Sequence, residues 1–327
     1  MVRGSTRPPH CCVVIANPIA GRVSESLVDK VAEHCSRFTP RVRVHWAGGR
    51  EDARNYAFQE VSRPSDEGTN VIVSVGGDGT TWEVVSGMTA GRGRPRRHAL
   101  MVIPAGTGNS NYRSHWGETP WPLALEAALG APDDRVRHLD LAWISELARP
   151  VVLGAGAGLT AQVLQDAREV KVTGPARLEA GLARAAARFT PYEGRVTVDG
   201  TVVHEGPTVF ANVGGGRFRA WQYDVLPRSV LDDGLLDVCI AGSGTPPAAL
   251  PGLLRTGRHV LEPGAVYTRG RQVVLERLDG APLCFEHDGE LLPPARSRYT
   301  LEVVAGALPV LCSPAPDRSR AAARDGK

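Results

Sequence analysis

The chain has 327 residues, of which 42% are hydrophobic and 22% are charged, and its formal net charge is +3. This length and composition are typical of a globular protein with two domains, and they exclude a fibrous or fully disordered chain. The mild positive charge gives no reason to expect nucleic acid as a partner. No apolar run approaches the roughly 18 residues that a membrane-spanning helix needs.

The six cysteines show no C-x-x-C spacing and lie mostly in apolar runs. They are expected to be reduced residues of the core, without disulfides or a zinc site. Residues 1–10 lack the apolar core of a signal peptide. We therefore expect a cytoplasmic protein, and any membrane contact would be peripheral, at the inner face.

The first half of the chain alternates apolar runs with amphipathic segments. The apolar runs predict strands at residues 11–16, 42–46, 71–75 and 100–103. Helical spacing predicts helices at residues 24–34, 52–61 and 121–129. This order indicates a doubly wound α/β nucleotide-binding domain over residues 1–136, and such sheets bind ligands at the carboxyl ends of their strands.

The glycine turn after the strand at 71–75 is the strongest local signal. It reads Gly76-Gly77-Asp78-Gly79-Thr80, and Thr80 or Thr81 is expected to cap a helix whose first turn carries Glu83. Unpaired N–H groups at such a helix start bind phosphate. Because a carboxylate such as Asp78 is unfavourable beside phosphates without a cation or water between, the turn indicates a nucleoside triphosphate with its metal. An ordinary Gly- and Asp-rich turn is the alternative.

Two further turns follow strands of the same predicted sheet. Asn17 to Arg22 follows the first strand, and Pro104 to Ser110 follows the strand at 100–103. Parallel strands bring such turns to one rim, where a second phosphate or base contact is expected. Tight connections without a ligand are the alternative.

The second half of the chain changes to short alternating strands, after a polar connection at 132–137. Helical spacing covers residues 161–187 with a break near Gly174, and Asp199-Gly200 predicts a type I′ hairpin. Strands are expected at 137–144, 151–158, 195–203, 208–213, 236–241, 272–276, 283–286 and 299–304. They predict a mostly antiparallel β domain over residues 137–312, followed by a disordered tail at 313–327.

Acidic turns interrupt this second half. Asp232-Asp233-Gly234 precedes a strand, and Asp288-Gly289-Glu290 follows another. Carboxylates on tight turns suit a hard divalent cation, although solvated turns look the same. The basic loop Arg92–Arg97 is either a solvated loop or a contact for phosphate or lipid headgroups.

Taken together, these motifs resemble the diacylglycerol kinase catalytic-domain family, which includes bacterial lipid kinases, sphingosine kinases and ceramide kinases. The resemblance implies an N-terminal α/β domain and a C-terminal antiparallel β-sandwich, with ATP between them. It rests on six motifs that occur in the family's order: Asn17-Pro18 with Gly21 and Arg22, Gly76 to Thr80 with Glu83, Pro104 with Gly106 to Asn109, Asp140, Leu231 to Leu235, and Asp288 to Glu290.

The same resemblance implies roles for single residues. Glu290 would be the catalytic base, and Asp233 would ligate Mg²⁺ with the backbone carbonyls of Val230 and Leu235. The acidic turns at 78, 233 and 290 would then meet in a single cleft. The residues implied in ATP binding are Asn17, Pro18, Gly21, Arg22, Gly77, Asp78, Gly79, Thr80, Glu83, Gly106, Thr107 and Asn109.

These roles imply a kinase that transfers the γ-phosphoryl group of ATP to the hydroxyl of diacylglycerol or a similar lipid alcohol. The chain departs from the family at Ser110, where many bacterial members have Asp, and at Trp82, where a small or polar residue is common. The alternatives are a relative of NAD kinase, a kinase of a soluble alcohol, and a nucleotide-binding module without catalysis. A homodimer is left open.

Overall fold

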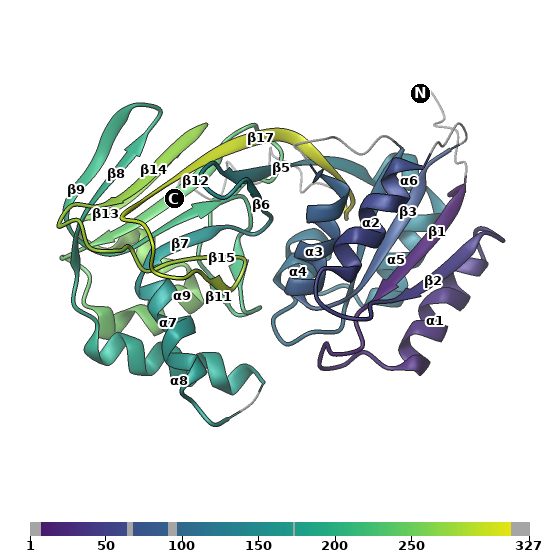
Figure 1. Ribbon diagram of the computed structural model, residues 1–327, viewed down its shortest axis with the longest axis horizontal. Helices are drawn as coiled ribbons and strands as arrows, with labels where there is room; N and C mark the ends of the chain where they lie inside the picture. Colours follow the sequence, from purple (N-terminus) through teal and green to yellow (C-terminus); the bar gives the residue numbers. More distant parts are fainter. Residues whose placement is uncertain (1–7, 64–67, 91–96, 173, 315–327) are drawn as a thin grey trace.

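The computed structural model describes residues 8–63, 68–90, 97–172 and 174–314. The chain forms two units that lie side by side, an N-terminal α/β unit and a C-terminal β unit with helices on one side (Figure 1). Strands β5 (Val136–Ile144) and β17 (Arg298–Leu311) connect them. The basic loop at 92–97, apart from Arg97, and all but the first two residues of the predicted tail lie outside the described residues.

The N-terminal sheet contains the four predicted strands in the parallel order β2-β1-β3-β4. The chain places β2 on one side of β1 and β3 on the other, so the strand order reverses between β1 and β3. This reversal is the switch point of a doubly wound sheet, as predicted. The bounds are β1 Cys11–Ala16, β2 Val42–Trp46, β3 Asn70–Gly76 and β4 His98–Pro104.

The predicted helices of this unit are present. Ser24 caps α1, because its Oγ accepts a hydrogen bond of 3.2 Å from the Leu27 N–H. Helix α3 begins at Asp78 with Gly77 as its N-cap, so the predicted caps Thr80 and Thr81 lie inside the helix and Glu83 lies in its second turn. Short α4 and α6 were not predicted. The bounds are α1 Glu25–Ser36, α2 Asp52–Ser62, α3 Asp78–Met88, α4 Ser110–Trp116, α5 Trp121–Gly130 and α6 Pro132–Arg135.

The C-terminal unit is an antiparallel β structure, as the alternating pattern predicted. The predicted hairpin joins β8 to β9, with Val198 opposite Thr201 and φ of 48° and 81° at Asp199 and Gly200. The strands besides β5 and β17 are β6 Arg149–Val151, β7 Ala155–Gly158, β8 Tyr192–Val198, β9 Thr201–Gly214, β10 Phe218–Arg219, β11 Tyr223–Asp224, β12 Leu236–Gly242, β13 Ala265–Gly270, β14 Gln272–Arg277, β15 Phe285–His287 and β16 Glu290–Leu291.

Helices lie below this β structure in the view of Figure 1. The predicted helical segment at 161–187 is two helices, α7 (Leu159–Arg168) and α8 (Pro175–Arg188). Helix α7 ends at Arg168, and Gly174, with a positive φ of 68°, directly precedes α8. With α9 (Leu250–Thr256) and the short 3₁₀ helices η2 (Pro247–Ala249) and η3 (Arg258–Leu261), they cover a core that includes Leu159, Phe210 and Leu250.

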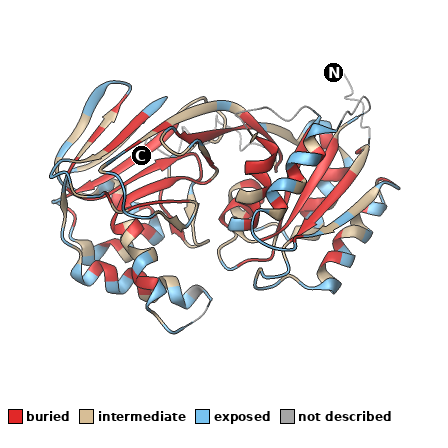
Figure 2. Ribbon diagram, viewed as in Figure 1, coloured by how far each residue is buried: buried red, intermediate tan, exposed pale blue. Residues whose placement is uncertain are grey.

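Strand β17 belongs to both units. It pairs with β14 and β5 over most of its length, and then Val310 pairs with Leu100 of β4 in parallel. Leu308, Val310 and Leu311 are buried in the N-terminal core, which the sequence placed entirely before residue 137. The arch of β17 over both units is visible in Figure 1, and Figure 2 shows buried residues along the strands of each unit.

All six cysteines are free thiols in this structure. Within the described part of the chain, no helix is long and apolar enough to cross a membrane.

Candidate active site

The predicted glycine turns meet at the switch point of the N-terminal sheet. A Cβ atom at Gly106 would overlap Gly77 Cα, and one at Gly76 would overlap the Thr80 side chain. The backbones of the two turns therefore touch, and only glycine permits this approach. The first turn joins them, since the Arg22 N–H donates to the Ala105 carbonyl at 2.9 Å.

Two predicted nucleotide residues hold these turns in shape. Asn17 Nδ2 donates to Thr80 Oγ1 at 3.1 Å, and Asn17 Oδ1 accepts from the Ile19 N–H at 3.1 Å. Asn109 has a φ of 48° and exchanges hydrogen bonds of 2.8 and 2.9 Å with the backbone of Gly106. Asn109 thus closes its own turn and does not line the cleft described below.

Asp78 connects the two glycine turns. Its Oδ2 accepts from the Ser110 N–H at 3.0 Å, and its Oδ1 accepts from both the backbone and side-chain N–H groups of Asn111 at 3.0 Å. The carboxylate thus caps helix α4, whose N-terminal donors and dipole favour a negative charge. The sequence suggested that Asp78 needs a cation or water beside it. Instead, the start of α4 supplies the compensation.

A cleft of about 610 Å³ lies between the two units. From the predicted site, the residues that line it are Asn17, Gly21, Gly77, Asp78, Gly79, Thr80, Glu83, Gly106, Thr107 and Glu290. Pro18, Arg22 and Asn109 are not among its lining residues. The expected meeting of the turns at 78 and 290 is therefore observed.

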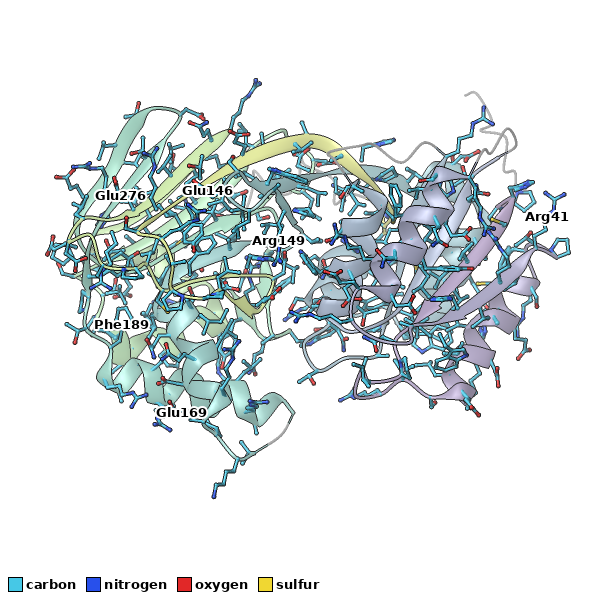
Figure 3. All side chains as sticks on the ribbon, viewed as in Figure 1. Arg41, Glu146, Arg149, Glu169, Phe189 and Glu276 are labelled. Carbon is cyan, nitrogen blue, oxygen red and sulfur yellow. The ribbon has the colours of Figure 1, made fainter. Side chains whose placement is uncertain are left out.

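The hairpin β15–β16 brings Glu290 to the cleft. Asp288, at a φ of 49°, accepts from the N–H groups of Val152 at 3.0 Å and Leu153 at 2.6 Å, which anchors the hairpin tip. The Glu290 carboxylate lies 3.8 Å from Arg50 of the N-terminal unit and 3.7 Å from Arg149 of β6. Glu290 therefore faces the junction of the two units, where Figure 3 shows Arg149.

Trp82 spans the same junction. From α3, its indole N–H donates to the Pro150 carbonyl at 2.9 Å, and its ring lies 5.6 Å from that of buried His287. The large side chain at this departure from the family therefore connects α3 to β6 and β15. This contact helps to fix Glu290 relative to the glycine turns.

A second interdomain contact involves Ser110, the other departure. Strands β10 and β11 form a small hairpin whose tip residues Ala220 and Trp221 have φ of 50° and 67°. The Trp221 N–H donates to Ser110 Oγ at 3.2 Å, and Arg113 donates to the Trp221 carbonyl. Ser110 thus receives the tip of this hairpin from the other unit.

Sequence reasoning missed a polar cluster deeper in the cleft. Glu286, Asn212 and Thr160 line it, and the first two are almost fully buried. Burial raises the pKa of Glu286 to about 7, against the opposing effect of nearby Arg219. The available signal was a single polar residue, Asn212, inside the otherwise apolar end of β9.

The carried-over metal residues do not join the cleft, so the expected meeting of all three acidic turns is not observed. Asp233 Oδ2 lies 2.9 Å from Arg269 Nη1, and Asp233 Oδ1 accepts from the Leu235 N–H at 3.1 Å. In the described ranges, no group of three His, Cys, Asp or Glu residues could hold a metal. Asp233 is paired with Arg269 in this structure, and its role as a Mg²⁺ ligand with the backbone carbonyls of Val230 and Leu235 stays a prediction.

This combination of fold and site defines a class: two-domain proteins with a doubly wound unit, a β unit and a cleft between them that the glycine turns line. Residues 12–144 match the family described as diacylglycerol kinase catalytic domain, and residues 154–312 match the YegS C-terminal NAD kinase beta sandwich-like domain.

Relatives agree with these matches. "Probable lipid kinase YegS-like" of Pseudomonas aeruginosa (strain UCBPP-PA14) is 30% identical over 271 residues, covering 82% of this chain and 83% of that protein. The protein of the same name from Stenotrophomonas maltophilia (strain K279a) is 30% identical over 280 residues, covering 81% of this chain and 84% of that protein. The chain therefore belongs to the YegS-like lipid kinases of the diacylglycerol kinase catalytic-domain family, which confirms the resemblance.

Solved structures share the fold. Two crystal structures from Bacillus anthracis str. Sterne cover 94% of this chain and 98% of their own, with TM-scores of 0.72 and 0.67 at 22% and 18% identity. The second is described as a diacylglycerol kinase. These likenesses support the two-domain architecture.

Proposed function

We propose that the protein is a kinase that transfers the γ-phosphoryl group of ATP to a hydroxyl group of a lipid or lipid-like alcohol. One observation carries this proposal. The cleft that contains the glycine turns of one unit also contains Glu290 of the other unit and continues into an apolar chamber. Donor site, proton acceptor and acceptor site are thus adjacent.

The glycine turns would bind the phosphates of ATP. Gly77 and Gly79 expose backbone at the carboxyl end of β3, where N–H groups can reach anionic oxygens. The switch-point position favours the same conclusion, because doubly wound sheets bind nucleotides there. Thr107, exposed at the rim, can add a hydroxyl contact.

The carboxylates at this end of the cleft fit Mg²⁺ that enters with the triphosphate. Mg²⁺ commonly takes one or two carboxylates together with phosphate oxygens. Asp78 and Asp288 use their oxygens as backbone caps, and Glu290 is needed for the acceptor hydroxyl, which leaves Glu83 as the carboxylate that would hold the ion together with phosphate oxygens. When bound, Mg²⁺ neutralises charge that develops on the phosphates.

Glu290 would orient the acceptor hydroxyl and take its proton. A carboxylate is a weak base towards an alcohol, so the proton moves late, once the oxygen–phosphorus bond has begun to form. Position therefore matters more than basicity. Asp288 fixes the hairpin of Glu290, and Arg50 and Arg149 hold the carboxylate between the units.

The apolar chamber would hold the aliphatic part of the acceptor. It is formed by α7, α8, α9 and the segment at 223–225, and its apolar lining residues are Val163, Leu164, Leu178, Leu182, Tyr223, Val225 and Leu254. Mostly apolar clefts with a few polar groups are typical small-molecule sites. A lipid acceptor also requires peripheral contact with the membrane that supplies it.

The test is an acceptor screen with γ-labelled ATP and Mg²⁺. We expect label in a lipid phosphate when bacterial lipid extract is present. Labelled NADP formed from NAD would instead indicate an NAD kinase. Label in a water-soluble alcohol alone would show that the acceptor is a soluble alcohol and not a lipid. Absence of transfer to every acceptor would refute the kinase proposal.

A further inference from the structure

The polar cluster of Thr160, Asn212 and Glu286 has no role in the proposed transfer, although it lines the same cleft. Its members come from different elements. Glu286 of β15 lies opposite Gly156 of β7, and Gly156 lies opposite Asn212 of β9. Thr160, in the first turn of α7, covers this row.

Gly156 leaves the space in which the cluster forms. A Cβ atom at Gly156 would lie 2.5 Å from both Asn212 Oδ1 and Thr160 Oγ1, and 3.0 Å from Glu286 Oε1. The three side-chain oxygens therefore converge over one glycine. Any larger residue at 156 would push them apart.

The cluster has unused hydrogen-bonding groups of both kinds. Thr160 Oγ1 donates to Asn212 Oδ1 at 3.1 Å, and Glu286 Oε2 accepts from the Gly289 N–H at 3.1 Å. Asn212 Nδ2 is buried and has no partner within the described structure. What remains is the donor on Asn212 Nδ2 and acceptor capacity on Glu286 Oε1 and Thr160 Oγ1.

A buried amide donor without a partner costs free energy, and a ligand group that accepts from it would remove this cost. A ligand group that also donates to Glu286 or Thr160 would complete the hydrogen bonds of the whole cluster. A hydroxyl both donates and accepts. An ester only accepts, and an ammonium only donates and would leave Asn212 Nδ2 without a partner.

We propose that this cluster binds a second hydroxyl group of the acceptor, beside the hydroxyl that is phosphorylated. The acceptor class is then a diol with one aliphatic chain, of the monoacylglycerol type, whose chain lies in the apolar chamber. Diacylglycerol places an ester at this position and fits less well. This inference rests on the proposed function and specifies its substrate class.

The experiment compares 1-monoacylglycerol, 1,2-diacylglycerol and a long-chain 2-amino alcohol of equal chain length as acceptors. For the wild-type protein we expect kcat/KM with monoacylglycerol to exceed the other two at least tenfold. Glu286→Gln and Asn212→Ser should each remove most of this preference while the KM for ATP stays unchanged. Glu205→Gln, which changes an exposed carboxylate of β9 paired with Arg195, is the matched control.

Equilibrium binding of the same three lipids without ATP separates this inference from the proposed function. Tighter binding of monoacylglycerol than of the other two lipids, weakened at least tenfold in Glu286→Gln, would support the diol site. This holds even if no lipid is phosphorylated, because the lack of phosphorylation would refute only the kinase proposal. Transfer to diacylglycerol or the amino alcohol at an equal or higher rate, with the same acceptor ratio in all variants, would overturn the diol site and leave the kinase proposal intact.

Discussion

Asp78→Asn tests whether this carboxylate is a structural cap or a metal ligand. Asp78 accepts three N–H groups at the start of α4, each at 3.0 Å. Asparagine keeps one acceptor oxygen, but its amide would turn a donor towards either the Ser110 N–H or the Asn111 groups. A charge-assisted hydrogen bond contributes about 1.5–3 kcal/mol, so we expect the free energy of unfolding to fall by about 2–3 kcal/mol.

The assay is thermal unfolding in EDTA, where no metal contributes. A loss of this size corresponds to a fall in Tm of about 5 °C. Asp29→Asn, an exposed acid of α1, is the control and should leave the Tm unchanged. If Asp78→Asn had the wild-type Tm in EDTA and differed only when Mg²⁺ is present, the capping role would be refuted.

Three further predictions follow from the site. Gly106→Ala would force the two glycine turns apart, so we expect at least a tenfold loss of ATP affinity by calorimetric titration. The control is Gly252→Ala, whose Cβ meets nothing within 4 Å and which should bind ATP as the wild type does. An ATP affinity of Gly106→Ala equal to that of the wild type would refute the close approach of the two turns. Because the guanidinium of Arg269 already compensates the charge of Asp233, Asp233→Asn should leave the Mg²⁺ concentration for half-maximal transfer unchanged. A clear increase in this concentration would support Asp233 as a metal ligand. Burial raises the pKa of Glu286 to about 7, so the native state binds this proton more tightly than the unfolded chain does. The native state therefore loses about 3 kcal/mol of stability as the pH rises from about 4.5 to 7. Glu286→Gln should raise the Tm at pH 8 but not at pH 4, and an equal change in Tm at both pH values would contradict the raised pKa.

Local patterns predicted much of the fold. The apolar run at Cys11–Ala16 has the same bounds as β1. The Asp199-Gly200 pair adopts the positive φ values that a type I′ turn requires, and it forms the predicted hairpin. Both depend on a few neighbouring residues. The parallel order of the N-terminal sheet followed from the alternation of strands and helices.

Features that depend on distant partners were not predictable. β17 continues past residue 304, because its residues 308–311 pair with β5 and Val310 also pairs with Leu100 of β4, about two hundred positions earlier in the chain. Helix α4 is short and largely polar. Its cap is Asp78, which follows β3 and lies beside the start of α4 because β3 and β4 end at the same edge of the sheet. No periodicity in the sequence signals either contact.

The site divides in the same way. Motif spacing found the glycine turns that line one end of the cleft, because each of these motifs follows a strand of one sheet. Arg269, which neutralises Asp233, lies on β13, and the resemblance alone could not show it. The polar cluster was missed because Glu286 and Asn212 become neighbours only through the pairing of both strands with β7.

The central claim is that Glu290 completes a phosphoryl-transfer site with the glycine turns across the cleft. The most direct measurement is the rate of label transfer from γ-labelled ATP by Glu290→Gln, alongside its Kd for ATP. We predict a fall in kcat of about 10²-fold or more with the Kd for ATP within threefold of wild type. Turnover at the wild-type rate would contradict the claim.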